Sequence, residues 1–240
     1  MDTSWDASVQ AVAVLEEPTR RRLYEYVVGR PGAVSRDDAA AALGIPRTTA
    51  AFHLDRLTDE GLLDTCYERR TGRTGPGAGR PAKLYHRSDR EIEITLPERQ
   101  YAVAGQLLAA AIQDAETEDI TPREAVNRRA RRYGETLGRT ARERAEAGRG
   151  AEDDQPSSDS RELMVRVLEA HGFEPRVEGG GIALANCPFR RLATEHPQLV
   201  CGMNLHLVAG LLASLDAPLQ AELAPTPGHC CVRLVQSARG

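Results

Sequence analysis

Cysteines in three separate segments are the residues of this chain best suited to chemistry. Cys187 lies in the run NCPF, Cys201 ends the run PQLVC, and Cys230 and Cys231 lie in GHCCVRL. Their thiolates are suited to binding zinc or an iron–sulfur cluster. However, thirteen and twenty-eight residues separate Cys187, Cys201 and Cys230, unlike the closely spaced pairs of a zinc ribbon. Spacing alone is therefore a weak signal, and cysteines packed as small apolar residues are the alternative.

The expected positions of these cysteines make a stronger case for a common site. Cys187 is predicted to end a strand, Cys201 to begin a helix, and Cys230 and Cys231 to open the last strand. Three element ends can converge, so Cys187, Cys201 and Cys230 are predicted to bind a metal ion or cluster. Because neighbouring strand residues point to opposite faces, Cys230 and Cys231 share the site only if the strand bulges. Cys231, His229, a carboxylate or a bound small molecule could supply the fourth ligand.

Cysteine-dependent catalysis is a further reading of the same residues. It requires a base positioned near an accessible thiolate, and His229 is adjacent to Cys230. Adjacent residues of a strand diverge, however, so the chain is not predicted to be an enzyme. Cys66 stands alone in a predicted strand and is expected to be a packing residue.

A second set of candidate residues lies on the run RTTAAFHLDRLTDEG, which begins at residue 47. Thr48, Thr49, His53 and Arg56 are predicted to meet DNA, as the start of a recognition helix does in the major groove. Arg47 stands at the helix start, where free backbone N–H groups also favour phosphate, so it is assigned to positioning. A buried, packing His53 is the alternative for that residue.

The glycine-rich run TGRTGPGAGRPAKLY, residues 71–85, adds three cations. Arg73, Arg80 and Lys83 would reach the DNA backbone or the adjacent minor groove. A nucleotide-binding loop is disfavoured because a second strand, rather than a helix, is expected to follow, and no G-x-x-x-x-G-K-[ST] motif is present. Asp55, on the helix before this loop, would repel phosphate and is left out of the contact set.

Helix and turn signals place these residues in a compact order. Helices are predicted near residues 17–30, 35–43 and 46–61, with Gly44 ending the second of them and Ile45 and Pro46 forming the turn to the third. Two short strands are expected on either side of the glycine-rich run. Helix, turn, helix and basic hairpin is the order of a winged helix.

The remainder of the chain predicts a second α+β unit. Helices are expected at 97–114, 122–144, 160–171 and 199–215, and strands near 173–177, 182–186, 219–224 and 230–236. The predicted organisation is a winged helix-turn-helix domain (8–95), a helical dimerisation region (96–146), a flexible linker (147–159) and a cysteine-containing sensor domain (160–238).

Overall composition limits the DNA-binding surface to a local patch. The net charge is −4 and aromatic residues make up 4%, so the chain is not basic throughout. The acidic start MDTSWDASVQ lacks the features of a signal peptide, and a cytoplasmic protein is expected. The apolar run from Leu199 to Leu215 contains Asn204 and His206. It is shorter than the roughly 20 residues of a bilayer span, so a buried helix is expected there and no membrane contact.

Residues 15–87 resemble the winged-helix domain of ArsR/DeoR-type bacterial transcriptional regulators. The resemblance is carried by LEEPTRRRLYEYV, RTTAAFHLDRLTDEGLL and GRTGPGAGRPAKLY. It implies a homodimer that binds double-stranded DNA at a palindromic operator.

The second half resembles the sensor region of the iron–sulfur-responsive repressors of the suf cluster-assembly operon, through NCPF, PQLVC and the last cysteine segment. This implies a regulator, more specifically a repressor, that senses iron–sulfur or redox status with an iron–sulfur cluster of unspecified type. Those sensors carry four spaced cysteines, whereas no cysteine lies between Cys201 and Cys230 here. A structural zinc ion and a small-molecule effector site are the alternatives.

Overall fold

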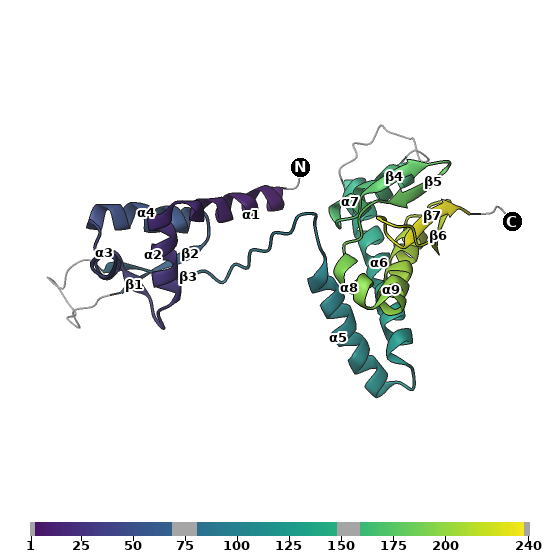
Figure 1. Ribbon diagram of the computed structural model, residues 1–240, viewed down its shortest axis with the longest axis horizontal. Helices are drawn as coiled ribbons and strands as arrows, with labels where there is room; N and C mark the ends of the chain where they lie inside the picture. Colours follow the sequence, from purple (N-terminus) through teal and green to yellow (C-terminus); the bar gives the residue numbers. More distant parts are fainter. Residues whose placement is uncertain (1–2, 69–80, 148–158, 238–240) are drawn as a thin grey trace. The chain divides into compact units, whose positions relative to one another are not determined.

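The chain divides into two compact units, Met1–Ile94 and Thr95–Gly240 (Figure 1). The computed structural model describes residues 3–68, 81–147 and 159–237. The first unit ends one residue before the predicted boundary at 95. The helices expected to form a separate region, 96–146, instead share one hydrophobic core with the elements after residue 159. Residues 148–158 of the predicted linker lie outside the described ranges.

The first unit combines helices with a small antiparallel sheet. Its elements are α1 (Thr3–Ala13), the 3-10 helix η1 (Val14–Glu16), α2 (Pro18–Val28), β1 (Val34–Ser35), α3 (Arg36–Leu43), α4 (Arg47–Asp59), β2 (Leu63–Glu68) and β3 (Ala82–Arg87). The strand order is β1-β3-β2, with Val34 opposite Tyr85 and Leu63 opposite Arg87. Three helices followed by a β2–β3 hairpin agree with the predicted order, whereas α1 was not predicted.

Short-range signals set the boundaries of these helices. The Ser35 hydroxyl accepts a hydrogen bond from the Asp38 backbone N–H at 3.2 Å, which completes a capping box at the start of α3. Gly44 ends α3 in the left-handed conformation, with φ of 66°, which glycine adopts at little cost. Ile45 N–H then donates to the Ala40 carbonyl at 3.1 Å. The turn that leads into α4 is therefore fixed by its own residues.

The second unit packs helices against a four-stranded antiparallel sheet. Its elements are α5 (Tyr101–Thr117), α6 (Pro122–Ala147), α7 (Asp159–Ala170), β4 (Pro175–Glu178), β5 (Gly181–Leu184), α8 (Arg190–Glu195), α9 (Pro197–Ser214), β6 (Leu219–Leu223) and β7 (Val232–Gln236). The strand order is β4-β5-β7-β6. The prediction of α+β structure agrees with these elements, although the short helix α8 was not predicted.

Helices α6 and α9 touch backbone to backbone at three glycines. A Cβ atom on Gly134 would collide with the Leu207 carbonyl oxygen, and one on Gly210 would collide with the Arg131 carbonyl oxygen. At Gly138 the collision would be with the Ser214 hydroxyl. Only glycine permits so close a crossing here.

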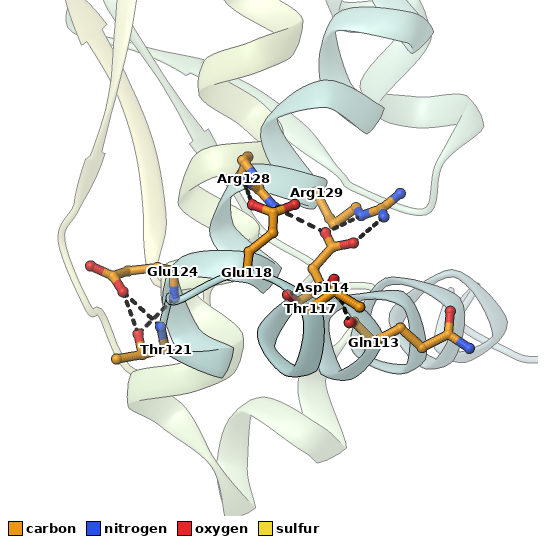
Figure 2. A network of polar contacts seen from close by, with 8 residues as sticks. All are labelled: Gln113, Asp114, Thr117, Glu118, Thr121, Glu124, Arg128 and Arg129. Carbon is orange, nitrogen blue, oxygen red and sulfur yellow. Dashed lines mark hydrogen bonds and ion pairs between the residues drawn. The ribbon is translucent and has the colours of Figure 1, made fainter.

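An acidic residue at the end of α5 joins this helix to α6 (Figure 2). The carboxylate of Asp114 accepts hydrogen bonds from both nitrogens of the Arg129 fork, Nε at 2.6 Å and Nη2, and from Arg128 Nη2 at 3.2 Å. Arg128 also binds Glu118, with Nη1 to Oε2 at 2.5 Å. The hydrogen bonds from Arg129 outweigh the opposing effect of burial and lower the pKa of Asp114 to about 2. Asp114 therefore stays ionised and pins the helical hairpin.

Helix α9 occupies the centre of the second core. Among the described helices it is the one that is long and apolar enough to cross a membrane by length and composition. In the structure it packs against α6 and β6, and its buried residues are Val200, Met203, Asn204, Leu207, Val208, Gly210, Leu211 and Leu212. The prediction of a buried helix near 199–215 is confirmed.

Candidate functional site

One side of α4 is open to solvent. Arg47, Thr48, Phe52 and Arg56 are exposed, and we refer to these four residues as the reading face. Phe52 keeps 64% of its surface accessible. The opposite side of the helix buries Ala50, Leu54 and Leu57, as predicted, and Thr49 lies half-buried between the two sides. The core thus holds α4 by one stripe and leaves the other free for a partner.

Both arginines of the reading face form ion pairs within the unit. Arg47 Nε lies 3.3 Å from Asp37 Oδ1, and Arg56 Nη2 lies 2.6 Å from Glu60 Oε1. The arginine side chains remain 74% and 45% exposed, respectively. Exposed pairs of this kind contribute at most about 1 kcal/mol. Either guanidinium can therefore exchange its carboxylate for a phosphate or a base edge.

His53 does not belong to the reading face. Its side chain is only 12% exposed. Nδ1 lies 3.3 Å from Arg20 Nε and 3.6 Å from Glu17 Oε2, so the ring bridges α4 to the start of α2. This position favours the packing alternative over contact with DNA.

The hairpin after α4 is tied to it through Asp55. Lys83 Nζ lies 2.7 Å from Asp55 Oδ1, and the Tyr85 hydroxyl donates to the same oxygen at 2.8 Å. Burial acts to raise the pKa of Asp55, but these two hydrogen bonds outweigh it and lower the pKa. The positive charge of Lys83, predicted to reach DNA, is thus balanced by the Asp55 carboxylate within the unit. The same ion pair compensates the negative charge of Asp55 beside the reading face.

The remaining residues singled out on the hairpin are Arg73, Arg80 and Cys66. Arg73 and Arg80, predicted to contact DNA, lie outside the described residues. Cys66 was expected to be a packing residue. It is exposed on β2 instead, because the outer end of this strand has no covering element among the described residues.

The second unit brings together the cysteines that are far apart in sequence. Cys187 lies close to Cys230, Cys230 to Cys231, and Cys231 to Cys201. We call these four residues the thiol cluster. Cys187 and Cys230 are buried, whereas Cys201 and Cys231 are partly exposed. Three chain segments thus bring cysteines near one another, and their binding of a metal ion or cluster stays a prediction.

The two adjacent cysteines lie just before the last strand. Strand β7 begins at Val232 rather than at residue 230. Their backbones still bond to neighbouring strands: Cys230 N–H donates to the Leu184 carbonyl, and the Cys231 carbonyl accepts from Ala224 N–H, both at 2.8 Å. The chain bends at Cys231, and Cys230 is buried whereas Cys231 is partly exposed. Cys201 also differs slightly from its predicted position, because α9 begins at Pro197 and the cysteine lies in its second turn.

The surroundings of Cys187, Cys201 and Cys230 favour the protonated thiol. The neighbouring Cys230 thiol, together with burial, raises the pKa of Cys187. The contact with Cys187 lowers the pKa of Cys230, but the contact with Cys231 and burial outweigh it and raise that pKa to about 12. Burial also raises the pKa of Cys201. A cysteine nucleophile requires the opposite shift, so this environment does not suit covalent catalysis.

The donor atoms suit a thiophilic ligand, although they are not arranged around one point. Sulfur ligands favour zinc, copper(I) and iron–sulfur clusters. Over the described ranges, no three His, Cys, Asp or Glu side chains are grouped as ligands of one metal ion. The four thiols follow one another as neighbours, and binding a metal would require them to move together and to release thiol protons.

A surface pocket gives access to one edge of the thiol cluster. It has a volume of about 370 Å³ and is lined by Cys231, by His229 and by Pro225, Thr226 and Pro227 of the β6–β7 connection. His229, a predicted candidate for the fourth ligand, is exposed, with Nδ1 3.2 Å from the Pro227 carbonyl oxygen. A ligand can therefore approach Cys231 from solvent.

Sequence reasoning missed one residue that contacts the thiol cluster. Asn204 Nδ2 lies 3.1 Å from Cys230 Sγ, and Asn204 is fully buried. Two signals could have identified it: it interrupts the apolar run of α9, and it stands three residues after Cys201, on a neighbouring part of the helix surface.

Comparison with known proteins finds one match, and it lies within the first unit. Residues 15–66 match the family described as a helix-turn-helix domain. This range runs from η1 through α4 into β2 and includes the reading face. The match supports a DNA-binding transcription regulator. Neither the curated proteins nor the solved structures contain a match to the chain.

Proposed function

We propose that this helix-turn-helix protein is a homodimeric transcriptional repressor whose affinity for a palindromic operator is set by a ligand at the thiol cluster. The observation that carries the DNA-binding part is the reading face of α4. It is exposed, cationic at two positions and apolar at one, and it lies within the matched helix-turn-helix range. The proposed place of action is the cytoplasm.

The composition of the reading face fits a role in the major groove. Arg56 can donate two hydrogen bonds to guanine, Thr48 can bond base edges, and Phe52 can contact a thymine methyl group. Arg47 at the helix start would bind phosphate, where the helix N-terminus also attracts negative charge. In a symmetric dimer, two such helices would meet major grooves about 34 Å apart, which is why a palindromic site is proposed.

The proposed signal is a thiophilic ligand, either an iron–sulfur cluster or a metal ion. The support is the meeting of four thiols from separate segments, with a pocket leading to Cys231. Cys187, Cys201 and Cys230 would hold the group, with Cys231 as the fourth thiol. When bound, the group would supply a change of charge and order at the core of the second unit. Operator affinity would change because the ligand binds the two DNA-binding states of the protein unequally.

A small organic effector is the second candidate for the signal. The pocket beside Cys231, at about 370 Å³, is within the size range of small-molecule sites. Its proline side chains would contact an apolar group, and its thiol and imidazole would contact a polar one.

The DNA-binding part is tested by selecting sequences from randomised duplexes with the full chain. We expect a palindromic sequence to be enriched and a dimer to bind it, as measured by light scattering of the complex. Arg47→Ala is expected to lower the slope of log affinity against log salt by about one, because one phosphate contact is lost. Failure to enrich any sequence, or an unchanged slope, contradicts the assignment of α4.

The ligand part is tested on protein isolated without oxygen. Visible absorption with equivalent iron and sulfide supports a cluster, and stoichiometric zinc without a change of operator affinity supports a structural ion. If neither is present, and operator affinity responds to organic extracts alone, the effector candidate is preferred and the metal proposal is abandoned.

A further inference from the structure

Asn204 is the one polar side chain of the described second unit that is completely buried. It lies on α9 beside the apolar Met203. The other buried polar residues of this unit have clear structural roles. Asp114 binds two arginines, and Asn186 donates to the Gly172 carbonyl and accepts from Arg99. Asn204 differs, because its Oδ1 atom has no hydrogen-bond partner.

An amide in this place is unfavourable for folding alone. Burying a carbonyl oxygen without a partner carries a desolvation cost, and most buried polar atoms avoid it. Leucine has a similar volume and would remove the unpaired oxygen from the core of α9. An asparagine at this position is therefore expected to stabilise the fold less than a leucine would. We look for a role of Asn204 outside folding.

The nitrogen of the Asn204 amide, unlike its oxygen, has a hydrogen-bond partner. Asn204 Nδ2 lies 3.1 Å from Cys230 Sγ. Cys230 is the central thiol of the cluster, since both Cys187 and Cys231 lie next to it. Cys201 precedes Asn204 by three residues on the same helix. The amide is thus held against the sulfur that links the buried and the accessible parts of the cluster.

We propose that Asn204 is a positioning residue of the thiol site: its amide N–H holds the Cys230 sulfur in place as a ligand of a thiophilic metal ion or cluster. Hydrogen bonds donated to a ligating sulfur orient it and tune the bound metal. This inference rests on the proposed function of the thiol cluster.

Cobalt(II) provides a direct test, because its thiolate complexes absorb in the near ultraviolet and visible. The full-length reduced chain is titrated with Co²⁺ without oxygen, as wild type, Asn204→Leu and the control Met203→Leu. Met203 is equally buried on the same helix but has no recorded bond to a thiol. We expect Asn204→Leu to bind Co²⁺ about 10- to 100-fold more weakly, with a shifted sulfur-to-cobalt band. Met203→Leu should match the wild type.

The outcomes separate this inference from the proposed function. If the wild type binds Co²⁺ and Asn204→Leu has the same affinity and spectrum, the role of Asn204 is wrong and the metal site stands. If the wild type binds neither Co²⁺ nor Zn²⁺, the role of Asn204 and the metal-ion site at the thiol cluster are both wrong. If the leucine variant does not fold, as judged by circular dichroism, the assigned Asn204 side-chain amide signal is followed by NMR in the wild type. A signal that Zn²⁺ leaves unchanged overturns the inference.

Discussion

The two units keep their functional side chains in opposite environments. In the first unit the reading face is exposed, with Phe52 at 64%, whereas in the second unit Cys230 is 3% exposed and Asn204 is fully buried. A surface that binds a large rigid partner can be chemically specialised at little cost to folding. Chemical specialisation of a buried site does cost stability, because each of its residues is also part of the core. Substitutions should therefore separate binding from stability in the first unit and couple them in the second.

The largest effect is expected from Gly210→Val, at the crossing of α6 and α9. Any side chain there meets the Arg131 backbone, so the second unit should lose about 3 kcal/mol or more of its free energy of unfolding. Urea unfolding followed by circular dichroism measures this. Gly105→Ala is the matched control, since a Cβ atom at Gly105 meets nothing within 4 Å and alanine favours a helix. Equal stability of Gly210→Val and wild type would refute the close crossing.

A smaller loss in the same unit is expected from Asp114→Asn, and it should depend on pH. The folded pKa of Asp114, about 2, lies below the ordinary value of 3.8. Its stabilising contribution is therefore complete above the ordinary pKa and disappears as pH falls through the folded pKa. Melting temperatures of wild type and variant should differ at neutral pH and converge towards about pH 2.

The control for this titration is Glu116→Gln, an exposed residue of the same helix. It should change neither the melting temperature nor its pH dependence. A difference between wild type and Asp114→Asn that stays constant down to the acid limit would show that the carboxylate charge is not what holds α5 to α6.

In the first unit, Arg56→Ala should change binding without changing stability. Loss of a contact to a base edge is expected to weaken the preferred sequence by about 1–3 kcal/mol and to relax the preference at that position. The free energy of unfolding should stay within about 0.5 kcal/mol of the wild type. Competition binding with matched and mismatched duplexes measures the first effect.

Arg191→Ala is the matched control, because Arg191 also pairs with a glutamate one helical turn away, Glu195, but lies in the second unit. It should leave DNA affinity unchanged. If Arg191→Ala lowers the affinity for the operator as much as Arg56→Ala does, DNA binding is not confined to the first unit.

The smallest effect is expected from Asp55→Asn. Removing this charge beside the reading face releases Lys83 and should strengthen binding to any duplex a few-fold, because electrostatic attraction to phosphate does not depend on sequence. The ion pair is partly exposed, so the loss of stability should be below about 1 kcal/mol. Affinities at two salt concentrations measure the change. Weaker binding would mean that the Lys83 ion pair itself orients the hairpin for DNA.

The helix-turn-helix was predictable because its signals are local. The capping pair Ser35 and Asp38, the left-handed Gly44 and the spacing of Ala50, Leu54 and Leu57 act within a few residues of one another. Each could be read directly from the sequence, and the structure confirms them. Helix α1 was missed because its residues TSWDASVQAVA contain no terminating glycine or proline.

The thiol cluster was only partly predictable because its contacts depend on tertiary structure. The sequence predicted which segments come together. The positions of the Cys230 and Cys231 side chains depend on the residue at which β7 begins, which is two residues later than predicted. Two local signals single out Asn204, but its partner, Cys230, is distant in sequence, so the contact between them follows only from the fold. The position of His53 likewise depends on Arg20 and Glu17 of another helix.

The glycine crossing between α6 and α9 also limits how the second unit can move. Cys201 and Asn204 lie towards the beginning of α9, and Gly210 rests on α6 further along. At Gly134 and Gly210 no side chain separates the two backbones. Neither helix can therefore shift along the other at these points without a backbone collision, so α6 and α9 are expected to move as one body.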